Sequence, residues 1–387
     1  MTSPQTIPTI CFIGLANLPV LAPEYAHHRA GGAELQQTLL AKALVRHGLS
    51  VSMIVADYGQ PDGVVYEGIK TYKAFHPDRG IPVLRFVHPR WSGLWAAMKR
   101  ADADIYYTSC AGGHLGQIVM FARLHGRKVV FRVASDSDCD PAALLVRFWR
   151  DKQLYRYGLR RADLVLAQTS KQHAALLSNY ARDSRVVSSL TESNGRRRRF
   201  GDRDIDALWV GHIRTVKRPE LLLAIARRLP TTRFHMIGGP MPRAQKLYDA
   251  VREEAATIAN VHFHGPIPYA QISQFYERAR ICVSTSDIEG FPNSYLQAWA
   301  HGTPVVAFLD PDRLLARNGL GRAATSIEEL CAGIQALTTD PHEWQGASLR
   351  SAQYIDSRFS AARMVAPYIE ALSELRAPPA PASASTD

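Results

Sequence analysis

The chain has 387 residues, of which 46% are hydrophobic, and its formal net charge at pH 7 is +11. This length predicts two domains of roughly 100–200 residues each, and the hydrophobic fraction is ordinary for a soluble globular protein. An apolar run of about 18 residues is absent, so no transmembrane helix is expected. Residues 1–8 lack the basic-then-apolar order of a signal peptide, so we expect a cytoplasmic protein.

The cysteine pattern and the positive charge narrow the class of protein further. The five cysteines form no CxxC pair, which argues against a zinc cluster or a disulfide framework, and we expect them to be reduced and mostly buried. The charge suits a polyanion, an anionic membrane surface or a phosphorylated substrate. The four arginines at 196–199 are interpreted as part of a solvated linker. No zinc finger or RNP-type motif accompanies them, so nucleic acid is not expected as a partner.

The first half of the chain alternates short apolar runs with segments of helical periodicity. Such runs are typical of buried parallel strands, and the periodic segments of helices that cover them. Strands are predicted at residues 9–13, 51–55, 105–107, 128–133 and 164–166. Helices are predicted at residues 33–47, from about residue 114 and from about residue 141.

The second half repeats this alternation. A helix is predicted to open at Pro219, since proline favours the first helical position, and to run to residue 229. Strands are predicted at residues 207–210, 233–237, 261–263, 281–284 and 304–308. The pattern predicts an α/β protein with two Rossmann-like, doubly wound parallel domains. Ligands of such sheets bind outside the carboxyl ends of the strands, so two facing domains would enclose a cleft.

The predicted domain boundaries follow from composition. An N-terminal domain is expected over residues 1–190, and a polar, arginine-rich linker over residues 191–206. A C-terminal domain is expected over residues 207–355. A last helix is expected over residues 356–375, packing back toward the first domain. The tail at 376–387 has too few large apolar groups to fold, so we expect it to be disordered.

The loop after the strand at 281–284 carries the most informative motif: Glu289, Gly290, Phe291, Pro292, Asn293, Ser294 and then Gln297. A helix is predicted to begin near Asn293, with that side chain as its cap. The main-chain amides of residues 291–295 would then be free to bind an anion. Glu289 and Gln297 can accept hydrogen bonds from sugar hydroxyls. A nucleotide-sugar site fits this arrangement, and a capped surface helix with a solvated glutamate is the alternative.

The motif resembles the donor site of the family 4 retaining glycosyltransferases, the glycosyl transferases group 1, which have the GT-B fold. Their usual form is Glu-Gly-Phe-Gly with a second glutamate eight residues after the first. Here Pro292 replaces a glycine, and Gln297 replaces the second glutamate. The resemblance implies that Glu289 contacts the donor sugar and that Gln297 binds the ribose. It also implies that the amides of residues 290–294 hold the diphosphate.

The loop at 211–218 resembles the family's Gly-Arg-x-x-x-x-Lys segment, whose cations hold the donor diphosphate. Lys217 falls on the lysine position and His212 on the arginine position, while Arg214 is placed to supply the missing guanidinium. Cations are needed because the leaving nucleoside diphosphate develops negative charge as the glycosidic bond breaks. If Arg214 or Lys217 is considered singly, the alternative interpretation is an exposed charge that binds no ligand.

Two glycines, Gly31 and Gly32, lie between the first strand and its helix, where they let the backbone approach a phosphate closely. The segment is neither a GxGxxG fingerprint nor a Walker loop. It resembles the family's Gly-Gly-x-Glu loop near the donor phosphates and the acceptor, and a plain tight turn is the alternative.

Asp136 begins an Asp-Ser-Asp-Cys-Asp run that suggests a DxD metal site. A calcium loop needs glycine and glutamate where Pro141 and Arg147 stand, and GT-B enzymes generally use cations and helix ends in place of a metal. We therefore expect no metal cofactor. Asp136 is predicted as an active-site residue, although the family's histidine before it is Ser135 here. His114 either reaches the sugar or faces solvent.

The resemblance further implies that backbone atoms near Ile267 read the base of a UDP- or GDP-sugar. It implies retaining transfer to a lipid-linked or saccharide acceptor, with the leaving phosphate acting as the base. A nucleotide-sugar 2-epimerase and a non-catalytic binding module are the alternatives. The acceptor suggests cell-surface polysaccharide or glycolipid synthesis at the inner face of the plasma membrane. Basic residues of the N-terminal domain could place that domain on an anionic membrane surface. They are Arg79, Arg85, Arg90, Lys99 and Arg100.

Overall fold

The computed structural model of the chain describes residues 8–82, 84–191, 196–241 and 244–375, and the predicted tail at 376–387 lies outside these ranges. The N-terminal domain is built on an eight-stranded sheet in the order β3-β4-β2-β1-β5-β6-β7-β8, parallel except for the β3–β4 pair. Its strands are β1 (Ile10–Ile13), β2 (Val51–Val55), β3 (Val65–Tyr66), β4 (Ile69–Lys73), β5 (Ile105–Ser109), β6 (Lys128–Arg132), β7 (Leu164–Ala167) and β8 (Arg185–Val186).

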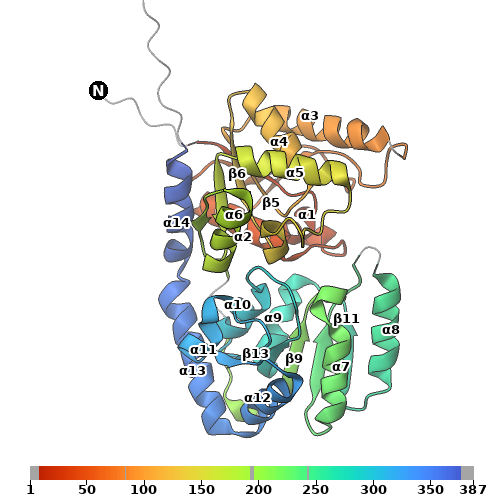
Figure 1. Cartoon of the computed structure of the whole chain (residues 1–387), viewed down its shortest axis with the longest axis vertical. Coiled ribbons are helices and arrows are strands. Elements are labelled where there is room, and N and C mark those ends of the chain that lie inside the picture. The colour runs from red at the N-terminus through yellow and green to blue at the C-terminus, as the bar shows by residue number, and fades with distance from the viewer. Residues whose placement is uncertain (1–7, 83, 192–195, 242–243, 376–387) are drawn as a thin grey trace, which may run out of the picture.

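Helices cover both faces of this sheet (Figure 1). The main ones are α1 (Leu18–Leu21), α2 (Gly32–Arg46), α3 (Ser92–Ala101), α4 (Gly113–Leu124), α5 (Trp149–Arg161) and α6 (Ser170–Tyr180). On β1, Ile10 and Phe12 join the core on one face, whereas Cys11 and Ile13 join the core on the other. A parallel strand buried on both faces reads as a continuous apolar run, which is why the sequence pattern located β1.

The C-terminal domain repeats the architecture on a six-stranded sheet, which is parallel throughout, in the order β11-β10-β9-β12-β13-β14. Its strands are β9 (Ile205–Val210), β10 (Phe234–Ile237), β11 (Val261–Gly265), β12 (Ala279–Ser284), β13 (Val305–Ala307) and β14 (Gly321–Ala323). Its helices are α7 (Pro219–Arg228), α8 (Gln245–Ala256), α9 (Tyr269–Arg278), α10 (Asn293–Ala300), α11 (Leu314–Asn318), α12 (Ile327–Thr339) and α13 (Pro341–Arg358). The predicted fold class, two doubly wound α/β domains, is confirmed.

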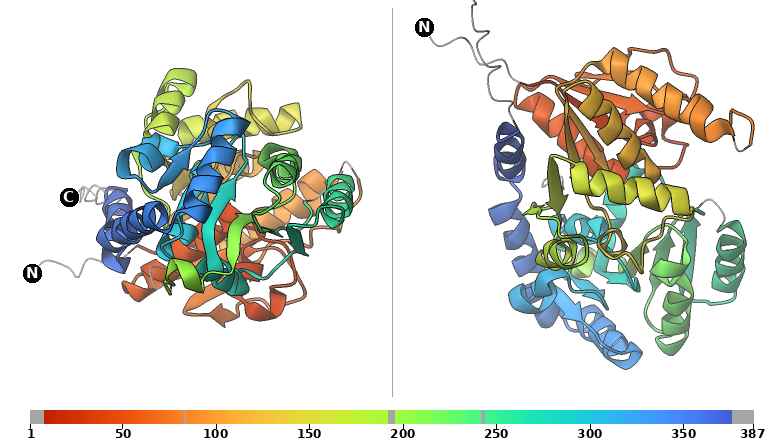
Figure 2. Two further views of the ribbon diagram at one scale, coloured as in Figure 1. Left: turned by 90° about the horizontal axis from the view of Figure 1, so that it is seen from below. Right: turned by 45° about the horizontal axis from the view of Figure 1, so that its top comes forward.

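The chain returns to the N-terminal domain at its end. Helix α14 (Ala361–Ser373) follows α13, and the two run along one side of the molecule across both domains (Figures 1 and 2). Val365 and Tyr368 are buried in the core of the N-terminal domain, where the Tyr368 hydroxyl donates to the Ser188 carbonyl at 2.8 Å. Arg185 pairs with Glu370 at 2.7 Å. The last helix therefore ties the two domains together.

Two local predictions were wrong. Residues 141–148 are not helical, and α5 begins only at Trp149. The Asp140 carboxylate instead accepts the Ala142 amide at 2.8 Å in a turn. The arginines at 196–199 are mostly exposed, as predicted, although Arg197 pairs with Asp356 at 2.7 Å and Arg198 with Glu277 at 2.7 Å. Strand β9 also begins two residues earlier than predicted, inside the expected linker.

The described part of the chain contains no helix that is both long and apolar enough to cross a membrane. The five cysteines are free, and Cys11, Cys139 and Cys282 are buried, as expected.

Candidate functional site

The segment from β12 to the start of α10 belongs to the C-terminal domain and contacts the N-terminal domain. The Asn293 side chain donates to the Gly32 carbonyl at 2.9 Å and accepts from the Gln36 amide at 3.0 Å. The predicted capping role of Asn293 is therefore wrong, since Pro292 occupies the N-cap position of α10 and Asn293 is its first helical residue. The contact brings the Gly31–Gly32 loop and the Glu289–Ser294 loop, which are far apart in sequence, to one place.

An ion pair lies at the centre of this junction. The Lys217 ammonium and the Glu289 carboxylate are in contact, and their side chains are only 16% and 12% exposed. Lys217 ends a short helical turn after β9, whereas Glu289 follows β12, the strand that neighbours β9 in the sheet. Carboxyl ends of neighbouring parallel strands meet at one sheet edge, which explains the pairing of residues 72 positions apart.

His212 joins this group from the loop between β9 and α7. Its Nε2 atom lies 2.9 Å from the Ala30 carbonyl oxygen, beside Gly31. Burial lowers the pKa of His212, and the positive charges of Arg214, Lys217 and Arg29 lower it further. The hydrogen bond to Ala30 opposes this lowering, and the net effect favours the neutral form of His212.

Arg214 has an unsatisfied group at this position. Its Nε atom is buried and has no hydrogen-bond partner among the described residues. A buried donor without a partner is costly, and an anionic ligand at the cation cluster would satisfy it. The Lys217–Glu289 pair and the unsatisfied Arg214 in the same loop as Lys217 are groups suited to a diphosphate and a hydroxylated ligand.

The amides at the start of α10 are only partly available to an anion. The Phe291 amide donates to Gln168 Oε1 at 3.2 Å, so the prediction that all amides of residues 291–295 are free was wrong. The Tyr295 amide donates to the carbonyl of the N-cap Pro292 at 3.1 Å, whereas Asn293 and Ser294 lie at the start of the helix, where amides have no partner within it. At Gly290, a Cβ atom would lie 2.5 Å from the Ala134 carbonyl oxygen, so only glycine allows this close approach.

Two buried glutamines hold the loop, and the sequence interpretation missed both. Gln168 donates to the Val133 carbonyl at 2.8 Å and accepts from the Ser189 hydroxyl at 3.1 Å as well as from Phe291. Gln172 accepts the Gln168 amide at 2.9 Å. Gln168 directly follows β7, and this post-strand position was the available signal, because such positions lie at the carboxyl edge of the sheet.

Asp136 reaches the same junction through its backbone and its side chain. Its amide donates to the Glu289 carbonyl at 3.0 Å. Its carboxylate accepts from Lys171 at 2.7 Å and from Gln172 at 3.1 Å. Asp136 thus stands against the Glu289 loop, with its charge already compensated.

Asp138 supports the loop that carries Asp136. Its buried carboxylate accepts the amides of Ala134 at 2.8 Å and Ser135 at 3.3 Å. Burial raises the pKa of Asp138 to about 6, against the lowering effect of these amides. This carboxylate has a structural role in the loop that follows β6.

The remaining predicted residues, His114, Gln297 and Ile267, form no hydrogen bond with the Lys217–Glu289 pair in the portion that the structure describes. His114 lies at the start of α4 with Nε2 3.4 Å from the Ser109 carbonyl oxygen, and burial lowers its pKa. Gln297 is half-buried on α10, and Ile267 packs partly against the core of the C-terminal domain. Within the described ranges, no group of three or more His, Cys, Asp or Glu side chains is arranged to hold a metal ion.

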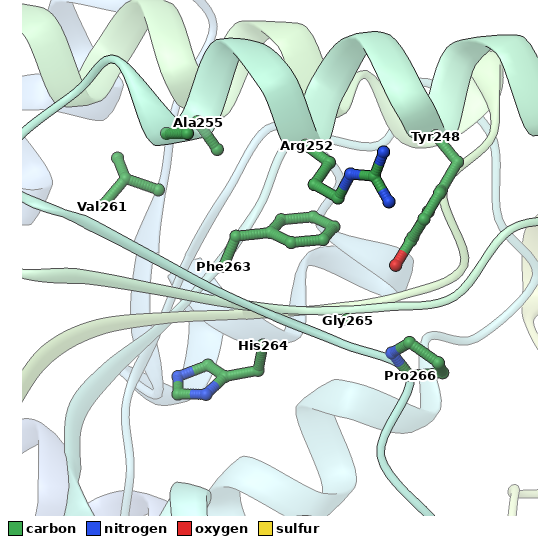
Figure 3. Close-up of a pocket in the computed structure, with 9 residues that line it drawn as sticks. Tyr248, Arg252, Ala255, Val261, Phe263, His264, Gly265 and Pro266 are labelled. Atoms are coloured by element: carbon green, nitrogen blue, oxygen red, sulfur yellow. The ribbon is translucent and has the colours of Figure 1, made fainter.

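A separate cavity of about 400 Å³ lies at the edge of the C-terminal sheet, between α8 and β11 (Figure 3). Tyr248 and Arg252 project toward it from α8, and Phe263 projects from β11. None of the predicted site residues lines this cavity. The candidate site is therefore the interdomain junction.

Family models match both domains. The model described as glycosyl transferase 4-like domain matches residues 31–190, and the model described as glycosyl transferases group 1 matches residues 204–340. The chain belongs to the group 1 glycosyl transferases. The two matches between them contain the Gly31–Gly32 loop, Asp136, Lys217 and Glu289.

Curated proteins similar to this group 1 chain include two D-inositol 3-phosphate glycosyltransferases. The protein of Frankia alni is 34% identical over 158 residues, and that of Thermobifida fusca is 28% identical over 207 residues. These alignments span 38% and 47% of this chain, and 36% and 45% of the relatives' own lengths.

Solved structures of similar fold cover nearly the whole chain. A sucrose-phosphate synthase of Thermosynechococcus elongatus has a TM-score of 0.75 at 19% identity, covering 95% of this chain and 99% of that one. Anabaena HepE in complex with UDP and glucose has a TM-score of 0.72 at 15% identity, covering 95% and 100%. The chain has the GT-B fold.

Proposed function

We propose that this protein transfers a sugar, with retention of anomeric configuration, from a UDP- or GDP-sugar to a hydroxyl of a lipid-linked or saccharide acceptor. The observation that carries the proposal is the junction of Arg214, Lys217 and Glu289. The ion pair of Lys217 and Glu289 precedes the start of α10, and a second cation, Arg214, carries an unsatisfied buried donor in the same loop as Lys217. This combination matches a diphosphate attached to a sugar.

The ion pair suggests how the donor enters. Without ligand, Lys217 neutralises the largely buried Glu289 carboxylate. A diphosphate would compete for Lys217 and would satisfy Arg214, which leaves Glu289 to accept hydrogen bonds from the sugar hydroxyls. The same cations would stabilise the charge that develops on the departing nucleoside diphosphate. No metal is required in this proposal, and the leaving phosphate itself would take the acceptor proton.

Proteins of the same fold support the donor class. Anabaena HepE forms a complex with UDP and glucose, and a pneumococcal O-GlcNAc transferase forms one with UDP and GlcNAc. A UDP-sugar is therefore the first donor to test. Synthesis of a polysaccharide or glycolipid at the inner face of the plasma membrane belongs to the same proposal.

A thermal-shift panel of UDP-, GDP-, ADP- and TDP-sugars tests the proposal, because a ligand that binds the folded state raises Tm by mass action. We expect one nucleotide class to raise Tm in the wild type and to lose this effect in Lys217→Met. Product analysis with an acceptor panel should then show a retained anomeric configuration. An altered sugar formed without acceptor would indicate an epimerase, and binding without donor consumption would indicate a non-catalytic module.

A further inference from the structure

A surface of exposed apolar side chains lies on the N-terminal domain where two loops meet. One loop, at residues 79–82 and 84–91, leads into α3, and the other, at residues 145–148, leads into α5, whose first two residues also belong to this surface. We call this surface the apolar rim. Its six large apolar side chains are 51–75% exposed: Ile81, Leu84, Val87, Leu145, Phe148 and Trp149. Exposed apolar groups that cluster in this way mark an interaction site, whereas scattered ones do not.

The two loops are held together although about 60 residues separate them in sequence. The Arg150 guanidinium lies 3.4 Å from the centre of the Phe86 ring. Arg147 lies over Phe148 at 5.3 Å. Arg150 also lies over Phe148 at 5.8 Å, so Phe86, Arg150 and Phe148 join the two loops of the rim.

The charge of the rim has a single sign. The sequence has no acidic residue between Asp78 and Asp102, and none between Asp140 and Asp151. Arg79, Arg85 and Arg147 are exposed, and none of them forms an ion pair with another described residue. These unpaired cations beside exposed aliphatic and aromatic side chains complement a surface that is apolar inside and anionic outside.

We propose that the apolar rim docks on an anionic lipid bilayer. Trp149 and Phe148 would enter the interfacial region, and the arginines would contact lipid phosphates. A soluble polyanion would use the cations but would leave six large apolar side chains in water, which is why we favour the bilayer. This inference deepens the proposed function, on which it rests only for the acceptor. The second loop of the rim begins nine residues after Asp136 in the chain. Docking there would bring a lipid-linked acceptor to the domain that carries Asp136.

Co-sedimentation of the full chain with vesicles tests the proposal without any sugar donor, so its outcome does not depend on transfer activity. We expect binding to vesicles that contain about 30% phosphatidylglycerol and weak binding to pure phosphatidylcholine. The variant Phe148→Ser/Trp149→Ser should lower the partition coefficient at least about tenfold, and Arg147→Glu should lower it by about fivefold or more. Leu349→Ser is the matched control, since Leu349 is 58% exposed on α13, away from the rim.

The fold of each variant is checked by its Tm and, where a donor has been found, by the donor-induced shift in Tm. The proposal is supported if the rim variants lose vesicle binding while Leu349→Ser and the wild type keep it. It is overturned if the wild type does not bind anionic vesicles, or if the rim variants bind as well as the wild type. It is equally overturned if heparin binds and displaces the vesicles while Phe148→Ser/Trp149→Ser has no effect, because the surface would then be a site for soluble polyanions.

Discussion

The main-chain amide of Asp136 donates a hydrogen bond to the carbonyl oxygen of Glu289, over a distance of 3.0 Å. This bond joins the loop after β6 to the loop after β12, and so joins the two domains at the residue we assign to the donor sugar. The position of Glu289 is therefore set by domain closure as well as by its own sheet. Groups that hold the closed arrangement should affect turnover even if they never touch the substrate.

Lys217→Met should weaken use of the donor. The substitution removes a cation that we assign to the diphosphate and leaves Glu289 without its partner. Loss of one charge-assisted contact of about 1.5–3 kcal/mol predicts a fall of about 10–100-fold in kcat/KM. Steady-state kinetics with varied donor measures it. The control is Arg227→Met, an exposed cation on α7 that pairs with Glu254; an equal loss in that variant would contradict the assignment.

Gln168→Leu should lower kcat more than it changes the donor Kd. The change leaves the Phe291 amide and the Val133 carbonyl without their side-chain partner, so the Glu289 loop loses its support. Each unpaired buried group costs about 1–3 kcal/mol, so Tm should also fall. Gln353→Leu, an exposed glutamine on α13, is the control. Unchanged kcat in a folded Gln168→Leu protein would show that this glutamine does not position the loop.

Gly290→Ala should prevent full closure of the junction. Its Cβ atom would lie 2.5 Å from the Ala134 carbonyl oxygen, a contact that backbone atoms cannot relieve cheaply. We expect turnover to fall about 5–150-fold, which corresponds to the cost of about 1–3 kcal/mol that is typical of overpacking. Small-angle scattering should show a more open chain. Gly201→Ala, which meets nothing within 4 Å, should behave as wild type in both measurements.

Asp138 should make stability fall as the pH rises. Burial raises its pKa from an ordinary value of 3.8 to about 6 in the folded chain. The unfolded chain therefore releases this proton first, and the folded state loses up to about 3 kcal/mol between pH 4 and pH 6. Urea unfolding of the wild type and Asp138→Asn at pH 4 and pH 7 measures the effect. The advantage of the wild type over the variant should shrink at pH 7; a constant difference would contradict the shift.

The sequence located the parts of the fold that depend on local patterns. Buried parallel strands such as β1 read as apolar runs, and Pro219 marked the start of α7. The candidate loops were found because they follow strands. Residues 141–148 misled the interpretation, since a proline and a run of apolar residues suit a helix as well as the turn that Asp140 stabilises.

The contacts between the two domains could not be predicted from such local patterns. Asn293 is a good helix cap by residue type, but its side chain bonds to Gly32, which is 261 residues away in the sequence. Gln168 has no neighbouring motif, and its role follows only from the packing of Val133, Ser189 and Phe291 around it. Tertiary contacts of this kind override local preferences, and no spacing rule reports them.

The transfer activity of Glu289→Ala, measured with the donor and acceptor that the wild type uses, tests the proposed site most directly. Glu289 lies at the centre of this site, where it pairs with Lys217 and is nearly buried. The matched control is Asp287→Ala, an exposed carboxylate in the same loop that pairs with Arg218. We predict that Glu289→Ala loses about 100-fold or more of the transfer activity, whereas the activity of Asp287→Ala stays close to that of the wild type. Full transfer activity in a folded Glu289→Ala protein would contradict the assignment of Glu289 to the donor sugar.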